Sequence, residues 1–181
     1  KGIWEGIPLK EACSLSWVGG DPGPSVRASL RALREAPPDF PLPVVWNGNL
    51  YGRSLLYRLL EGVVDVYIPD LRYGNDTCAR RWSGAVKYWK IAAASLEILA
   101  AQEAEIFVRI LILPGHLKCC HRPALSWLAR RMKGRVRVRP MAQYSPDHLI
   151  EPQHGEMARR PAAEEVETVA RWIREFDLLL V

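Results

Sequence analysis

The sequence predicts an α/β fold built on a parallel sheet. Short β-rich segments alternate with helical segments along almost all of the 181 residues, which is typical of βα units. Polar or glycine-rich turns follow the carboxyl ends of the strands, where parallel architectures place their binding face. A chain of this length can bury a continuous core as one domain.

The amino-terminal half shows these units most plainly. An amphipathic helix with Val26, Leu30 and Leu33 on one face follows the first strand, and Pro37 and Pro38 end that helix. The pattern of this half therefore predicts strands at 14–18, 43–47 and 63–68, and helices at 25–35 and 53–61.

The carboxyl-terminal half continues the pattern with its most apolar strand at 106–113. The segment 162–176 has the spacing of an amphipathic helix. We predict a sheet domain over residues 1–150, and a linker and helix packing on that domain over 151–181. The remaining predicted elements are helices at 86–102 and 125–132, a strand at 135–141 and a sixth short strand at 178–181.

Composition narrows the class of protein. With 49% hydrophobic and 25% charged residues the chain is typical of soluble globular proteins. No apolar run approaches the roughly 20 residues that span a bilayer, and the start shows no signal-peptide stretch. We expect no membrane segment, a cytoplasmic location and reduced thiols at Cys13, Cys78, Cys119 and Cys120.

The net charge of +5 raises the question of nucleic acid, since basic surfaces attract phosphates. The arginines are scattered, however, and the densest cluster, within 130–139, spans the end of a helix and the start of a strand. Such a charge run indicates a solvated face, so nucleic acid is not expected as a partner.

The turn after the first strand, Gly19-Gly20-Asp21-Pro22, is the sharpest motif. Two glycines at a strand end let a ligand approach the backbone, and the adjacent Asp21 carboxylate suits an ammonium group. A tight βα turn with an incidental acid is the alternative, and the four residues alone do not separate the two interpretations.

The next two strand ends carry further polar groups. Asn47 and Asn49 offer amides suited to ribose hydroxyls, although singly each could be a turn former. Asp70 and Arg72 follow the third strand and place charges at the same edge.

Arg109 lies within an apolar strand, where a full charge needs a partner or a polar interior, so we predict that it points inward. His116 follows that strand in Leu-Pro-Gly-His, although a lone histidine in a turn is more often structural. Gln143 ends the next strand.

Together these strand ends resemble the radical S-adenosylmethionine (SAM) superfamily, specifically relatives of pyruvate formate-lyase activating enzymes, over about residues 17–146. The segment 108–120 carries the most specific part of the likeness. The resemblance implies that Gly19, Gly20, Asp21 and Pro22 take the place of a Gly-Gly-Glu-Pro motif that holds the SAM amino group, with Asp for Glu. It also implies that further residues contact SAM or line the barrel: Asn47, Asn49, Asp70, Arg72 (where lysine is usual), Arg109, His116 and Gln143.

The resemblance further implies an incomplete (βα)6 barrel with parallel strands that lacks its first βα unit. That unit would carry the Cys-x-x-x-Cys-x-x-Cys segment that ligates a [4Fe-4S] cluster, a spacing this sequence does not contain. A complete enzyme would reductively cleave SAM to a 5′-deoxyadenosyl radical that abstracts hydrogen from a small molecule or from a partner glycyl radical enzyme. We predict that this chain alone does not, and we assign no catalytic residue.

Two other function classes stay open: a SAM- or nucleotide-binding module without a cluster, and a nucleic-acid-associated structural protein. The apolar edge at 14–18 predicts a missing segment, a partner chain or a dimer contact there. His116, Cys119, Cys120 and His121 could form a small zinc site, but their spacing is irregular, so we predict packing thiols and no metal site.

Overall fold

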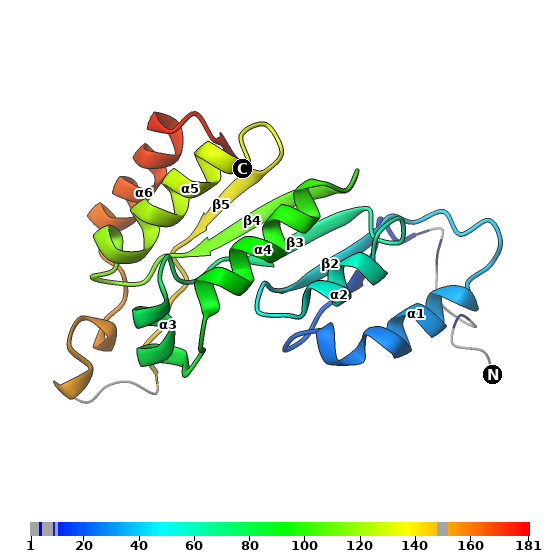
Figure 1. The fold of residues 1–181 in the computed structure, drawn as a ribbon, viewed down its shortest axis with the longest axis horizontal. Helices are drawn as coiled ribbons and strands as arrows, with labels where there is room; N and C mark the ends of the chain where they lie inside the picture. The colour runs from blue at the N-terminus through cyan, green and yellow to red at the C-terminus, as the bar shows by residue number, and fades with distance from the viewer. Residues whose placement is uncertain (1–3, 5–8, 10, 148–151) are drawn as a thin grey trace.

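The computed structural model describes residues 4, 9, 11–147 and 152–181. Six strands form one sheet in the order β1-β2-β3-β4-β5-β6, and every neighbouring pair is parallel (Figure 1). The strands are β1 (Leu15–Trp17), β2 (Val44–Asn49), β3 (Val66–Asp70), β4 (Glu105–Leu111), β5 (Arg137–Met141) and β6 (Leu179–Leu180).

Helices connect successive strands. They are α1 (Val26–Arg34), α2 (Ser54–Leu59), α3 (Asp76–Ser83), α4 (Tyr88–Ala100), α5 (Arg122–Arg131) and α6 (Ala163–Glu175), with 3₁₀ segments at Gly23–Ser25 and Pro152–Ala158 and a π-helix at Leu117–His121. None of the helices among the described residues is long and apolar enough to cross a membrane.

The predicted α/β class and parallel sheet are confirmed, and the sheet is open rather than closed into a barrel. The short sixth strand is present as β6, while α3 was not predicted. The chain extends β2 to Asn49 and β3 to Asp70, so these two polar residues are the last residues of their strands. The predicted boundary between residues 150 and 151 lies outside the described residues.

The two faces of the sheet differ. Because side chains alternate along a strand, residues in register share a face. One face is buried under the helices, with Trp46, Tyr67, Val108 and Val138 at most 3% exposed. These residues share a core with side chains of the covering helices: Tyr57, Leu96, Leu125 and Ile173.

Most side chains of the opposite set are half-buried, and we call this surface the open face. It carries the polar residues Asn47, Asn49, Asp70 and Arg109, and the apolar residues Ile68, Phe107 and Leu111. β1 lies at the end of the strand order beside β2, so its outer edge has no strand partner among the described residues. The partner expected at that edge stays a prediction.

The basic cluster on residues 130–139 is mostly matched within the chain. Arg131 pairs with Glu97 and Lys133 with Asp177, both at 2.7 Å. Arg137 pairs with Glu105, and Arg135 donates to two backbone carbonyls. Exposed pairs of this kind stabilise little, but they leave less unbalanced charge for phosphates than the sequence count suggests.

Candidate functional site at the strand ends

Three strand ends meet in one polar network on the open face. Nε of Arg109 donates to Asp70 Oδ1 at 2.6 Å, and an Nη of Arg109 donates to Asn47 Oδ1 at 2.7 Å. The side chains of Arg109 and Asp70 are 26% and 17% exposed. Water solvates charges poorly at such partly buried positions, so each of the two charges is stabilised by the other. Arg72 lies at the rim, with an Nη 3.7 Å from Asp70 Oδ2. We call Asn47, Asp70 and Arg109 the strand-end network.

The Gly19-Gly20 turn adopts backbone conformations that favour glycine, with φ of +101° and +53°. A Cβ built on either glycine would have no heavy atom within 4 Å. The conformation, and not crowding, therefore requires glycine here, and both residues are exposed.

Asp21 connects this turn to β2 through a hydrogen bond. Its Oδ1 accepts a hydrogen bond of 3.2 Å from the backbone N–H of Asn49. The carboxylate lies against Gly48, where an added Cβ would come within 2.7 Å of Asp21 Oδ1. Pro22 then begins the 3₁₀ turn by accepting from Ser25 N. Gly48 is thus a positioning residue whose role the sequence did not reveal.

The two asparagines of β2 differ in what they do. The Asn47 side chain holds Arg109, whereas Asn49 Oδ1 accepts from Tyr51 N at 2.8 Å within its own turn. The Asn49 carbonyl also accepts from the Tyr57 hydroxyl. For Asn49 the geometry favours the turn-forming interpretation.

His116 and Gln143 lie apart from the network. His116 is 3% exposed, and its Nδ1 donates to the Pro114 carbonyl at 2.8 Å while its ring packs edge-on against Trp82. Gln143 is an exposed residue just after β5. Neither side chain has a contact with Asn47, Asp70 or Arg109 among the hydrogen bonds of the described residues.

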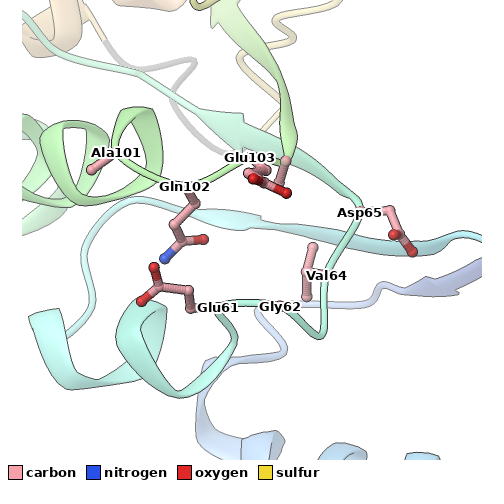
Figure 2. A pocket seen from close by; sticks show the side chains of 8 residues that line it. Glu61, Gly62, Val64, Asp65, Ala101, Gln102 and Glu103 are labelled. Atoms are coloured by element: carbon pink, nitrogen blue, oxygen red, sulfur yellow. The ribbon is translucent and has the colours of Figure 1, made fainter.

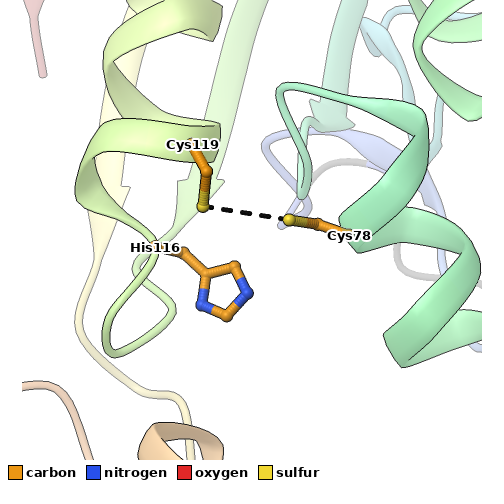
Figure 3. A group of neighbouring side chains, drawn as sticks. All are labelled: Cys78, His116 and Cys119. Carbon is orange, nitrogen blue, oxygen red and sulfur yellow. Dashed lines mark hydrogen bonds between the residues drawn. The ribbon is translucent and has the colours of Figure 1, made fainter.

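His116 instead faces two cysteines (Figure 3). The sulfurs of Cys78, from α3, and Cys119, from the π-helix, are 3.8 Å apart. Together with a ring nitrogen of His116, these atoms all lie within 4.8 Å of one another. Thiolate and imidazole are good metal ligands, so this group, which we call the Cys-His cluster, could hold an ion.

The set of four residues considered from the sequence is not the set that the fold assembles. His121 is buried, its Nε2 accepts from Leu113 N at 3.1 Å, and burial lowers its pKa to about 4. The Cys120 side chain is fully buried, and burial raises the pKa of its thiol. Cys78 takes part instead, and it lies on the helix that sequence patterns missed. The Asn75-Asp76 pair, a helix-start signal, was the available clue.

A pocket lies at the amino-terminal ends of the strands, opposite the strand-end network (Figure 2). Its walls come from residues just before β3 and β4: Glu61, Gly62, Val64, Asp65, Ala101, Gln102, Glu103 and Ala104. That is the amino-terminal edge, and no predicted site residue lines it. The strand-end network and the Cys-His cluster both belong to the carboxyl edge.

Comparisons with known proteins agree with the fold. No protein-family model matches the chain. An uncharacterised protein of Methanocaldococcus jannaschii is 32% identical over 168 residues, which cover 93% of this chain and 48% of that protein. The chain thus spans about half the length of this curated relative.

A solved domain of a pyruvate formate-lyase activating enzyme from Bacteroides vulgatus has a similar fold. The TM-score is 0.70 at 11% sequence identity, covering 94% of this chain and 98% of that domain. At this identity the likeness establishes the fold alone.

Proposed function

We propose that the open face binds SAM at the carboxyl ends of β1 to β4, and that the chain is the SAM-binding part of a radical SAM enzyme similar to pyruvate formate-lyase activating enzymes. The observation that carries the proposal is the strand-end network, which places a guanidinium, a carboxylate and an amide where parallel folds bind ligands. The fold it shares with a domain of such an enzyme supports it.

The groups at this edge suit the groups of SAM. Arg109 has five N–H donors, of which Asp70 and Asn47 take two among the hydrogen bonds of the described residues, so other donors can serve the SAM carboxylate. Asp21 uses Oδ1 for the Asn49 N–H and has acceptor capacity left for an ammonium group. The exposed Gly19-Gly20 backbone lies beside it.

The cluster of that enzyme class does not fit the cysteines of this chain. All four are among the described residues: Cys13 precedes β1, Cys78 and Cys119 belong to the Cys-His cluster, and Cys120 lies beside Cys119. In a [4Fe-4S] cluster each thiolate binds a different iron, whereas sulfurs 3.8 Å apart are spaced like two ligands on one ion. We therefore derive no radical step, and propose that cluster ligands come from a segment outside these 181 residues or from another chain.

In that complete enzyme the proposed reaction is hydrogen abstraction after reductive SAM cleavage, from a small molecule or a glycine of a partner enzyme. The 181-residue chain alone, reconstituted anaerobically with iron and sulfide, should yield no 5′-deoxyadenosine from SAM and reductant. SAM turnover in that assay would contradict the assignment of the missing ligands.

Calorimetric titration with SAM in the absence of iron tests the binding itself. Saturable binding is expected, and Asp21→Ala should weaken it about 10- to 100-fold, because a charge-assisted hydrogen bond contributes roughly 1.5–3 kcal/mol. Asp21→Asn retains an acceptor for Asn49 N–H but removes the charge, so it should weaken binding as well. Glu175→Gln, on the exposed side of α6, is the control.

Each outcome has a separate meaning. Full affinity in Asp21→Asn with a loss only in Asp21→Ala would assign Asp21 to turn packing and remove it from the ligand site. Absence of saturable SAM binding in the folded wild type would end the proposal. Steeply salt-dependent binding to mixed DNA in its place would favour the nucleic-acid alternative.

A further inference from the structure

We propose that Cys78, His116 and Cys119 form a zinc site with three protein ligands. The site is independent of SAM binding and of the [4Fe-4S] cluster. Cys78 follows β3 and His116 follows β4, so the site lies at the same carboxyl ends of the strands as the strand-end network.

The spacing of the donor atoms suits one tetrahedral ion. Two thiolates on a zinc ion, each with a Zn–S bond of about 2.3 Å, are separated by about 3.8 Å at the tetrahedral angle. The sulfurs of Cys78 and Cys119 are 3.8 Å apart, and the His116 nitrogen lies within 4.8 Å of both.

The imidazole of His116 has its ring orientation and tautomer fixed. A carbonyl can only accept, so Nδ1 must carry the proton that binds Pro114 O at 2.8 Å. Nε2 is then the nitrogen with a free lone pair. A backbone carbonyl on the second nitrogen is the arrangement that metal-binding histidines commonly use.

Asn75 fixes the distance between the two cysteine segments. Its Oδ1 caps α3 by accepting from Cys78 N at 2.8 Å, and its Nδ2 donates to the Cys119 carbonyl at 2.7 Å. The same amide nitrogen lies 3.4 Å from Cys78 Sγ, where an N–H donor stabilises a thiolate. The glycine at position 74 lets the two segments approach each other this closely, because a Cβ on Gly74 would overlap the backbone of Cys120.

The π-helix separates the roles of the adjacent cysteines. Its wide turn is closed by a hydrogen bond from His121 N to His116 O, and such turns are frequent at functional sites. Cys119 is exposed beside half-buried Cys78, whereas Cys120 is buried. An ion can thus reach the two outer thiols. Three protein ligands would leave a fourth position open, as in zinc sites that bind a water or a substrate.

Zinc content per chain tests the site. Protein purified with its thiols reduced and dialysed against a mild chelator should retain about one zinc per chain, measured by mass spectrometry. Cys78→Ser and Cys119→Ser, at partly exposed positions, should lower zinc affinity by more than roughly 100-fold, since losing an outer partner of a ligand alone costs 10- to 100-fold. His116→Asn should do the same.

Two matched controls use the remaining cysteines. Cys13→Ser removes an exposed thiol that precedes β1, and Cys120→Ser removes the buried thiol 4.0 Å from Cys119 Sγ. Both should retain zinc. Substitution with Co²⁺ should give the absorption of a tetrahedral thiolate site in the wild type and in both controls, and circular dichroism checks the fold of each variant.

Three results would overturn the site. The first is equal zinc binding by the wild type, Cys78→Ser and Cys119→Ser. The second is a folded, reduced wild type that binds no zinc. The third is a wild type purified with a Cys78–Cys119 disulfide that still takes up no zinc after the disulfide is reduced. None of these bears on the SAM titration, so the two proposals can fail separately.

Discussion

Asn75 donates a hydrogen bond of 2.7 Å from its side-chain amide to the backbone carbonyl of Cys119, 44 residues further along the chain. The amide thereby joins the start of α3 to the π-helix and holds the two thiols of the Cys-His cluster side by side.

Replacing Asn75 should separate these two roles. Asn75→Ser can still cap α3 but cannot reach Cys119, so zinc affinity should fall about 10- to 100-fold with little loss of stability. Asn75→Ala should also lose about 1 kcal/mol of unfolding free energy through the missing cap. Chelator competition and urea unfolding measure the two effects, and unchanged zinc affinity in both variants would show that Asn75 does not position the ligands.

Gly74→Ala should destabilise the chain, because the new Cβ would overlap the backbone of Cys120 and force two segments apart. Overpacking of this kind costs about 1–3 kcal/mol, measurable by urea unfolding. Gly52→Ala is the matched control, since its Cβ would come no closer than 3.2 Å, to the flexible end of Leu56, with the Tyr57 hydroxyl next at 3.5 Å and no backbone atom among the three nearest atoms. Equal stability of the two variants would contradict the close packing of Gly74.

Arg109→Met should leave Asp70 without its closest partner on the open face and lower the unfolding free energy by about 1–3 kcal/mol. Asp70→Asn should be destabilising too, and the double variant should cost less than the sum of the single variants because they share one interaction. Urea unfolding of all four proteins gives this cycle. Strict additivity would mean that the ion pair contributes nothing to the stability of the fold.

We expect the hydrogen bonds of Glu165 to make the unfolding free energy fall at acidic pH. Its carboxylate accepts from Arg159, Gly115 N and Ala162 N, and these bonds lower its pKa from the usual 4.5 to about 2. A lowered pKa in the folded state stabilises the fold above about pH 4.5, and that contribution is lost as the pH falls from there toward 2.

Glu165→Gln tests this contribution. The stability difference between wild type and Glu165→Gln should be largest at pH 7 and shrink at pH 3, as urea midpoints would report. Glu164→Gln, one residue earlier on α6 and exposed, is the control. A difference that stays constant between pH 7 and pH 3 would show that the Glu165 carboxylate is not tuned by these bonds.

The strand ends were largely predictable, since apolar β-rich runs followed by polar turns define the carboxyl edge of a parallel sheet. An arginine in an apolar strand required a partner, and Asp70 and Asn47 supply it. The pattern could not predict that the Asn49 side chain would accept a hydrogen bond from Tyr51 N, because turn-forming and ligand-binding asparagines look alike in sequence.

The Cys-His cluster could not be predicted from spacing. Cys78 lies on α3, an eight-residue helix with a mostly polar sequence, and the tertiary contact through Asn75 brings it to Cys119. Cys119 is exposed and Cys120 is buried, although their sulfurs lie 4.0 Å apart. The π-helix that carries both cysteines leaves no sequence pattern of its own.

The half-buried hydrocarbon of the open face has a calorimetric consequence. A ligand or chain segment that covers Ile68, Phe107 and Leu111 must remove them from water, so its binding should carry a negative heat-capacity change and become more exothermic on warming. A ligand held only by the rim charges would show little of this temperature dependence. The slope of binding enthalpy against temperature therefore measures how far any occupant reaches across the sheet.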